Sequence, residues 1–182
     1  MYCRIEHYEK YEDIVAKTYT SSFPVSEQFP FAILKRCDTE PNVHLSVILL
    51  NKIPVGMQFT VDLPNDITYL MYYAVIEEYR CRGVGSNVLK GLVQSNKRVM
   101  LCIERPVDKL TQRRKKFYIR NGFYETGVFF EDMGVQYEVL ISCKDYMPTT
   151  QDLLNRYKCM TNDRNFWFEI KDYFNVDHIN YV

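Results

Sequence analysis

The chain has 182 residues, of which 47% are hydrophobic and 25% charged, and its 23 Lys and Arg residues balance 23 Asp and Glu residues. This length is typical of one domain, or one domain with an appendage, and it can bury a full core without crosslinks. A net charge of zero excludes the overall attraction by which strongly basic proteins bind nucleic acids or anionic membranes.

Neither the apolar residues nor the cysteines indicate a membrane or an oxidising compartment. No run approaches the roughly 20 apolar residues that cross a bilayer. Residues 1–13 mix charged and aromatic residues where a signal peptide would have an apolar core. The six cysteines are scattered, without a CxxC pair or zinc-ligand spacing. We therefore expect a cytoplasmic protein that holds no metal, binds no membrane and keeps its thiols reduced.

The first part of the chain predicts a strand followed by two helices. Apolar side chains recur at helical spacing between Tyr8 and Tyr19, and two prolines then interrupt the chain. We expect a strand at residues 2–6, a helix at 8–19, a second helix at about 29–36 and a loop at 38–42.

Strand patterns dominate the middle of the chain, and helices then alternate with strands. β-Branched and apolar runs at 44–50, 54–61 and 68–76 are separated by turn residues, which predicts antiparallel strands. Helical periodicity and further apolar runs predict, in order, a helix at 83–95, a strand at 98–103, a basic helix at 108–120 and strands at 123–130 and 136–142. Residues 131–134 are expected to form the last hairpin turn.

The order of elements, β-αα-βββ-α-β-α-ββ, predicts an α+β fold. Hairpins come first, then a strand-helix-strand crossover, then a final hairpin, which indicates a mixed, mostly antiparallel twisted sheet flanked by helices. We place this domain at residues 1–143. Residues 144–182 are expected to form a C-terminal extension that packs on the domain or forms a self-association interface. In it, a capping box at 149–152 predicts a helix through Lys158, and residues 166–168, Phe-Trp-Phe, are available to dock the extension.

The segment from Arg80 to Ser86, RCRGVGS, lies at a predicted strand-to-helix junction. Gly83 and Gly85 let a ligand approach the backbone closely, and the free N–H groups of the first helical turn favour an anion such as a pyrophosphate. A plain glycine turn with solvent-facing arginines is the alternative, since short glycine motifs recur by chance. No Gly-Lys-Ser/Thr follows, which excludes a Walker loop, and the spacing does not match a Rossmann fingerprint.

Four further segments accompany this loop. Tyr73-Ala74-Val75-Ile76 precedes it, and residues 116–123 read Lys-Phe-Tyr-Ile-Arg-Asn-Gly-Phe. Arg80-x-x-Gly83-x-Gly85 resembles the Arg/Gln-x-x-Gly-x-Gly/Ala motif of the GNAT superfamily of acyl-CoA-dependent N-acetyltransferases. Residues 116–123 are similar to that family's second signature, and residues 22–27 and 101–106 are similar to one bacterial branch. The similarity runs from about residue 2 to 143, in the family's order.

The resemblance implies that acetyl-CoA is the cosubstrate. Its pantetheine would pair with backbone groups where the fourth strand splays from its neighbour, here Ala74, Val75 and Ile76. Its pyrophosphate would lie on backbone N–H groups at the start of the next helix. That part of the implied cofactor site comprises Arg80, Arg82, Gly83, Val84, Gly85 and Ser86.

The resemblance also implies direct attack of a primary amine on the thioester. Tyr118 is the implied donor of a proton to the departing sulfur, and Glu104 is the candidate base. A structural role is the alternative for each residue: Tyr118 as a core tyrosine packed beside Phe117, and Glu104 as a surface carboxylate paired with Arg105. The glutamates at 77–78 are weaker candidates for the base.

The acceptor side departs from the related branch of the family. Met71 and Cys102 stand where that branch has carboxylates, so we expect a less acidic acceptor pocket. Strand alternation predicts that Tyr69, Met71 and Tyr73 share one face. Apolar and aromatic walls are suggested by Met57, Phe59, Tyr69, Met71 and Tyr73. We expect an amphipathic amine acceptor, a small molecule or a peptide, rather than a spermidine-like polyamine.

Two other functions fit the same residues. A non-catalytic acyl-CoA-binding sensor would keep the glycine loop, and the residues at 71 and 102 favour it, whereas Tyr118 and Glu104 favour an enzyme. A tRNA-directed acetyltransferase would use the basic helix, which is otherwise a solvated face. The balanced charge makes this the weakest of the three hypotheses. We expect no nucleic-acid partner, and a monomer or a homodimer.

Overall fold

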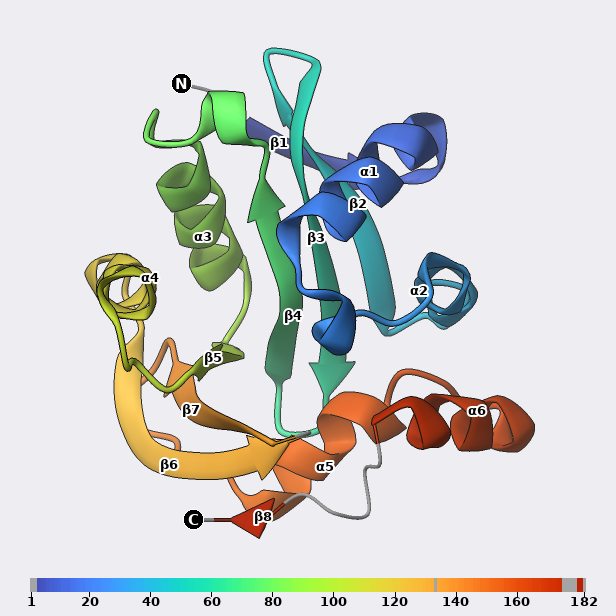
Figure 1. Cartoon of the computed structure of the whole chain (residues 1–182), viewed down its shortest axis with the longest axis vertical. Coiled ribbons are helices and arrows are strands. Elements are labelled where there is room, and N and C mark those ends of the chain that lie inside the picture. Colours follow the sequence, from blue (N-terminus) through green and yellow to red (C-terminus); the bar gives the residue numbers. More distant parts are fainter. Residues whose placement is uncertain (1–2, 133, 175–179, 182) are drawn as a thin grey trace.

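One mixed sheet forms the centre of the chain, and helices cover both of its faces (Figure 1). The computed structural model describes residues 3–132, 134–174 and 180–181. The strands are β1 (Cys3–His7), β2 (Val43–Leu50), β3 (Ile53–Leu63), β4 (Ile67–Val75), β5 (Arg98–Glu104), β6 (Tyr124–Asp132), β7 (Val135–Ile141) and β8 (Asn180–Tyr181). The helices are α1 (Glu12–Ser22), α2 (Phe31–Cys37), α3 (Val84–Ser95), α4 (Lys109–Arg120), α5 (Thr150–Lys158) and α6 (Arg164–Phe174). Short 3₁₀ helices are η1 (Glu9–Tyr11), η2 (Val25–Glu27) and η3 (Glu77–Tyr79).

The strand order in the sheet is β1-β2-β3-β4-β5-β7-β6-β8. Neighbouring strands are antiparallel except β4 and β5, which are joined by the crossover helix α3 and run parallel. The predicted α+β fold with a mixed, mostly antiparallel sheet is therefore confirmed, as is the predicted order from β1 to β7. The last hairpin is tighter than expected, because Asp132 already pairs with Val135. Met133 lies outside the described residues, and the sequence did not predict β8.

The two faces of the sheet carry different helices. On one face, α1, α2, α5 and α6 pack on the largest group of buried side chains, which includes Tyr19, Leu34 and Phe166. On the other face, α3 and α4 cover a smaller group that includes Leu89 and, partly buried, Phe117. Figure 1 shows these two layers on opposite sides of β3 and β4. No helix of the described chain is long and apolar enough to cross a membrane.

Helices α5 and α6 share a core with the rest of the chain. Leu153 and Tyr157 of α5 and Phe166 of α6 are buried in the same cluster as the α1 and α2 side chains. The predicted capping box is present: the Thr149 hydroxyl accepts from the N–H of Asp152, and the Asp152 carboxylate accepts from the N–H of Thr149.

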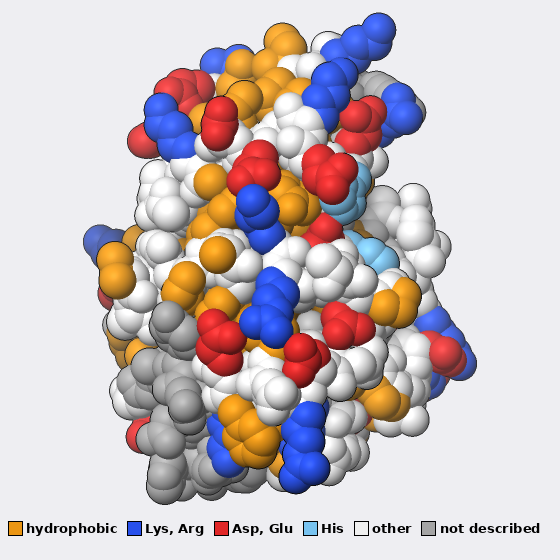
Figure 2. All heavy atoms as spheres, turned by 90° about the vertical axis from the view of Figure 1, so that its right-hand side faces the viewer, with side chains coloured by type: hydrophobic (Ala, Val, Ile, Leu, Met, Phe, Trp, Pro, Cys, Tyr) orange, Lys and Arg blue, Asp and Glu red, His pale blue; other side chains and the backbone are white. Residues whose placement is uncertain are grey.

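Charged side chains of both signs alternate over the face where α1, α2 and α6 lie (Figure 2). Among them, Arg36 of α2 reaches Asp163 at 3.1 Å and Glu169 of α6 at 3.3 Å. The same guanidinium stacks on the ring of Phe166, 3.7 Å from its centroid. These contacts join α2 to the start of α6.

Strands β4 and β5 separate soon after they meet. They pair only over Ile67–Tyr69 of β4 and Arg98–Met100 of β5. Beyond that point β4 continues to pair with β3 on its other side, and β5 pairs with β7. The sheet therefore opens between the ends of two adjacent strands, and this opening positions the candidate site.

A β-bulge lies at the point of divergence. The register of β3 against β4 shifts between Phe59 and Thr60, which leaves Met71 as an extra residue in β4. As a result Tyr69 and Met71 contact the core on the α1 face, whereas Tyr73 contacts the core on the α3 face. The prediction that these three side chains share one face was wrong, because a bulge interrupts strict alternation.

Candidate active site

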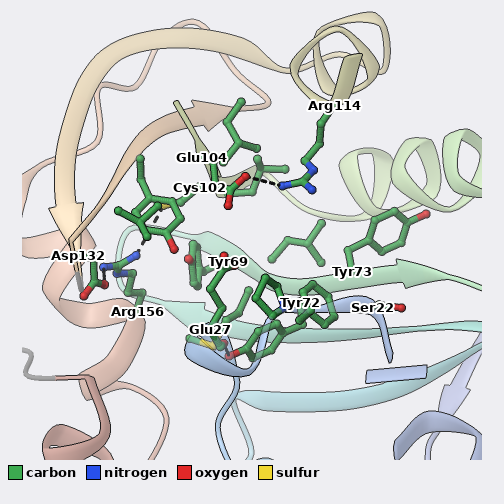
Figure 3. Close-up of a pocket in the computed structure, with 18 of the residues that line it drawn as sticks. Ser22, Glu27, Tyr69, Tyr72, Tyr73, Cys102, Glu104, Arg114, Asp132 and Arg156 are labelled. Atoms are coloured by element: carbon green, nitrogen blue, oxygen red, sulfur yellow. Dashed lines mark hydrogen bonds and ion pairs between the residues drawn. The ribbon is translucent and has the colours of Figure 1, made fainter. Parts of the chain in front are cut away.

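A cavity of about 290 Å³ lies where β4 and β5 diverge (Figure 3). Its charged lining residues are Glu27, Glu104, Asp132, Arg114 and Arg156. Its aromatic lining residues are Phe23, Tyr69, Tyr72, Tyr73, Tyr118, Tyr137 and Tyr157. Met71 and Cys102 also line it, as expected for an acceptor wall. Met57 and Phe59 do not, because both side chains are fully buried in the core, so the expectation that they form its walls was wrong.

Three backbone N–H donors at the start of α3 have no partner within the helix. Gly83 precedes the helix in the left-handed conformation, with φ of +79°, and its carbonyl accepts the first helical bond, from Asn87. The N–H groups of the first three helical residues, Val84, Gly85 and Ser86, therefore precede the helical bonding pattern, and no side chain caps this end. Such a group of donors, with the helix dipole behind it, suits a phosphate.

Packing within the chain, as well as the approach of a ligand, requires a residue without a side chain at position 85. A Cβ at this position would lie 3.1 Å from Cζ of Phe117 in α4 and 3.4 Å from the hydroxyl of Tyr73 in β4. The Tyr73 hydroxyl donates to the Gly85 carbonyl at 2.9 Å. The absence of a side chain thus allows the first turn of α3 to lie against both neighbours, and this holds the three backbone donors in place.

The backbone at the end of β4 is partly used within the chain. Ile76 donates its N–H to the Val55 carbonyl and accepts from the N–H of Tyr79, each at 2.9 Å. The Ala74 carbonyl lies against Gly56 of β3, on the side away from β5. Because backbone groups alternate along a strand, those of Tyr73 and Val75 face the gap that β5 leaves. Of the three residues expected to pair with pantetheine, the geometry supports Val75, through its N–H, because its carbonyl accepts from Nε of Arg80.

The two arginines of the glycine loop are exposed. Arg80 donates from Nε to the Val75 carbonyl at 2.8 Å, and the Arg82 guanidinium lies 5.7 Å from the Tyr79 ring centroid. The backbone at Cys81, between them, has a φ of +58°. Arg80 therefore joins the end of β4 to the loop, and both guanidinium groups remain beside the α3 N-terminus, where they add positive charge.

Tyr118 of α4 both packs in the core and lines the cavity. Its ring centroid lies 5.3 Å from that of Phe117 and 5.8 Å from that of Phe123. Burial raises the pKa of Tyr118 to about 12, and the nearby positive charge of Arg114 opposes this. The phenol therefore keeps its proton at neutral pH, which suits a proton donor. The structural and catalytic interpretations of Tyr118 are compatible, because the same side chain packs in the core and lines the cavity.

Glu104, at the end of β5, also lines the cavity. Its Oε2 lies 3.3 Å from Nη1 of Arg114 (Figure 3). Arg105, the expected partner in the structural alternative, instead donates to the side chain of Gln136 at 3.1 Å. Glu104 thus faces the cavity and α4 rather than pairing with its neighbour in sequence.

A second carboxyl, that of Glu27 in η2, meets Glu104 across the cavity. Tyr72 holds this segment, because its hydroxyl donates to the Glu27 carbonyl at 2.7 Å. The pKa of Glu27 is raised, first by burial and then by the nearby charge of Glu104, while Arg114 lowers it. The sequence placed Glu27 in a segment similar to one branch of the family but gave it no role.

The opposite end of the cavity is closed by a buried ion pair. Arg156 of α5 and Asp132 of β6 meet at 2.6 Å, with 4% and 6% of their side chains exposed. The Tyr157 hydroxyl donates to the same carboxylate at 2.8 Å, and Nη1 of Arg156 lies 3.9 Å from the Cys102 sulfur. Sequence reasoning missed this cluster, in which Cys102 and Arg156 are 54 residues apart along the chain.

Helix α4 directs part of its positive charge inward. Besides Arg114, Lys115 contacts Glu138 at 2.8 Å and Glu125 at 3.0 Å. Arg113 extends toward the glycine loop, where its Nη2 lies 3.5 Å from the Cys81 sulfur. Across the residues that the structure describes, no group of three or more His, Cys, Asp or Glu side chains is arranged to hold a metal ion.

Comparisons with known proteins agree with this geometry. The profile of the Acetyltransferase (GNAT) family matches residues 8–123. A GNAT-family protein from Bacteroides thetaiotaomicron is similar in structure, with a TM-score of 0.68 and 22% identity over 87% of this chain and 95% of that one. Arabidopsis thaliana Naa50, solved with the bisubstrate analogue CoA-Ac-MVNAL, has a TM-score of 0.59 and 17% identity over 79% and 100% of the two chains.

A Bacillus subtilis acetyltransferase solved with CoA has a TM-score of 0.58 and 12% identity over 77% of this chain and 97% of that one. At these identities the structural matches establish the fold alone. No protein of curated function matches the sequence.

Proposed function

The chain belongs to the GNAT family of acetyltransferases, and from this premise we propose that it transfers the acetyl group of acetyl-CoA to a primary amine of a small molecule or peptide. One observation carries the proposal. Near the opening between β4 and β5 lie the uncapped N–H donors of α3 on one side, and a phenol and two carboxyls that line the cavity on the other. The first group suits the phosphates of a nucleotide cosubstrate, and the second suits proton transfer at an amine.

The residues at the opening fit acetyl-CoA. The N–H groups of Val84, Gly85 and Ser86 would hold its pyrophosphate, with Arg80 and Arg82 beside them. Backbone groups of β4 that face the gap would hold its pantetheine. Bound there, acetyl-CoA supplies an activated acetyl thioester. Tyr118 lines the cavity, which supports its hydroxyl as the donor of a proton to the departing sulfur.

Glu104 is the proposed base. An amine is an ammonium ion at neutral pH and must lose a proton before its nitrogen can attack. Glu104 lines the same cavity as Tyr118, and Arg114 orients its carboxylate. The base and the acid thus lie on different elements, β5 and α4, that border one cavity.

The remaining features of the proposal concern the acceptor and the extension. The peptide analogue bound to Naa50 supports a peptide as one class of acceptor, and the small cavity supports a small amine as the other.

Residues 144–182 are proposed to act as an extension of the domain at 1–143, since α5 adds Arg156 and Tyr157 to the cavity wall. We propose a monomer or homodimer without a nucleic-acid partner.

A thiol-release assay tests the proposed function. Purified protein is incubated with acetyl-CoA and a panel of primary amines and short peptides, and free CoA is measured with a thiol reagent. We expect CoA release that depends on an amine, together with a thermal shift by CoA and none by ATP. Stabilisation by CoA without release for any amine would instead favour the non-catalytic sensor. No stabilisation by CoA would contradict the cofactor site itself.

A further inference from the structure

The carboxyls of Glu27 and Glu104 form a pair that comes from two distant segments. Glu27 is on η2, between α1 and α2, and Glu104 is at the end of β5 (Figure 3). The two side chains line the same cavity, where the charge of Glu104 acts on Glu27, and the Arg114 guanidinium lies 3.3 Å from the Glu104 carboxylate. Tyr72 fixes the η2 backbone through the Glu27 carbonyl. Such a pair is rigidly positioned and opens into the cavity proposed for the acceptor.

We propose that Glu27 and Glu104 act as one ammonium-binding and proton-accepting pair, and that this pair restricts the acceptor to amines carrying a single positive charge. The inference rests on the proposed function and deepens it, because it names the second member of the base and the charge class of the substrate.

Two carboxyl groups that line one partly buried cavity favour a proton or a cation between them. Two carboxylates in contact cannot both be ionised without a compensating charge, so such pairs hold one proton or bind a positive group. Arg114 compensates one charge of this pair. An incoming ammonium ion is suited to compensate the other, and its N–H groups can donate to both carboxylates.

The proton transfers balance along this route. One carboxylate of the pair takes a proton from the ammonium ion, and the proton is then held between the two carboxyl oxygens. The neutral nitrogen forms the C–N bond while the C–S bond breaks, and Tyr118 gives its proton to the sulfur. The acetylated nitrogen returns a proton to the Tyr118 oxygen. The pair finally releases its proton to water, so that one ammonium ion and one thioester give an amide, a thiol and one proton.

The charged groups that line the cavity can be balanced by one additional cation. Three carboxylates and two guanidinium groups line it, so a single negative charge is uncompensated. The Asp132–Arg156 pair at the far end is already neutral and buried. A second ammonium group at that end would face a guanidinium and aromatic side chains, and the one carboxylate there, that of Asp132, is already paired with Arg156. A monoamine with an apolar or aromatic remainder fits this distribution, and a polyamine does not.

The groups that face Glu27 determine how the pair responds to pH. They are Glu104 of β5, Arg114 of α4 and Tyr137 of β7, whose own pKa is raised by burial and by the charge of Glu27. Asp132 and Arg156 lie beyond Tyr137 and act on it in opposite directions. Because burial and Glu104 raise the pKa of Glu27, the pair becomes protonated at a higher pH than an ordinary glutamate would. Activity should therefore fall as the pH drops through this raised pKa.

The first test compares two amines of equal length. Hexylamine carries one ammonium group and 1,6-diaminohexane carries two, on the same six-carbon chain. We expect kcat/KM to be at least about tenfold higher for the monoamine, since the second charge has no partner in the cavity. An equal or higher kcat/KM for the diamine would overturn the restriction to a single charge.

The second test removes each carboxyl in turn. Glu104→Gln should lower kcat/KM for the monoamine about a hundredfold, as expected for loss of a general base. Glu27→Gln should lower it about tenfold to a hundredfold, because one charge-assisted bond to the ammonium ion is lost. It should also move the acid limb of the pH–rate profile to lower pH, since the group with the raised pKa is gone. Glu9→Gln, which changes an exposed carboxyl of η1, is the matched control.

Binding of CoA separates this inference from the proposed function. Both variants should bind CoA with the affinity of the wild-type protein, because neither residue lies at the glycine loop. A Glu27→Gln variant with normal CoA affinity and an unchanged pH–rate profile would overturn the pair while leaving acetyl transfer intact. An absence of turnover by the wild-type protein with every amine would instead contradict the proposed function.

Discussion

The two sides of the proposed active site, the glycine loop and the cavity, are built in different ways. The cofactor side consists of consecutive residues, Arg80 to Ser86, in which Gly83 begins α3 and Gly85 allows close packing. The acceptor side is assembled from η2, the end of β5, α4, β6 and α5, which are far apart in sequence. A local motif therefore identifies the first side from sequence, whereas only the folded chain reveals the second. The same difference predicts that substitutions on the two sides will affect different measured quantities.

The largest effect is expected for Tyr118→Phe, at the junction of the two sides. Loss of the phenol proton should lower kcat by about 10²- to 10⁴-fold, the usual contribution of a general acid. The dissociation constant for CoA should stay unchanged, because the ring and its packing remain. The matched control is Tyr124→Phe, which removes a hydroxyl from an exposed side chain of β6. Unaltered turnover of Tyr118→Phe would remove Tyr118 from the proposed chemistry.

Arg156→Met should show how much of the acceptor side depends on α5. The substitution leaves the buried Asp132 carboxylate without its partner, which typically costs about 3–5 kcal/mol in the free energy of unfolding. Urea denaturation measures this loss, and KM for the amine should rise while the affinity for CoA does not. The exposed Arg164→Met is the control, with a change within about 0.5 kcal/mol. Equal stability of both variants would show that the ion pair is dispensable.

Gly85→Val tests the cofactor side alone. A branched side chain would collide with the Phe117 ring, displace the first turn of α3 and misplace its N–H donors. Overpacking typically costs about 1–3 kcal/mol, so we expect the dissociation constant for CoA to rise about tenfold. Gly91→Ala is the control on the same helix, because no atom lies within 4 Å of the added Cβ. Calorimetric titration that finds equal CoA affinity for both variants would contradict the role given to Gly85.

The smallest effect concerns Glu40, which fixes the start of α6. Its pKa is lowered by the backbone N–H of Asn162 and by the side chains of Asn162 and Thr161. A lowered pKa in the folded state stabilises the fold above the ordinary pKa of glutamate, near 4.5, and this stabilisation is lost as the pH falls further. Glu40→Gln should therefore flatten the decline of the melting temperature below that pH. A decline as steep as that of the wild-type protein would show that Glu40 contributes little.

The parts of the fold that could be predicted from sequence depend on local patterns. Periodicity located the helices and strands, and the Thr149–Asp152 capping box correctly predicted the start of α5. The bulge at Met71 could not be predicted, since alternation continues through it in the sequence and only pairing with β3 reveals the extra residue.

For the site, too, only the residues that lie in local sequence patterns could be predicted. The glycine loop and Tyr118 lie in recognisable motifs, and Glu104 lies at the end of an apolar strand. The roles suggested for Glu27 and Arg156 depend on contacts across the fold: Glu27 meets Glu104 from another element, and Arg156 meets Asp132, 24 residues away. No local pattern encodes such contacts, because the partner of a buried charge is chosen by packing.

The central claim is that the glycine loop and the cavity bind different molecules, and amide NMR tests it most directly. CoA is added to ¹⁵N-labelled protein, and shifts are followed residue by residue. We expect the largest shifts at the amides of Val84, Gly85 and Ser86, with small changes at Glu27. The largest shifts at η2 or α5, with the three α3 amides unmoved, would contradict the account.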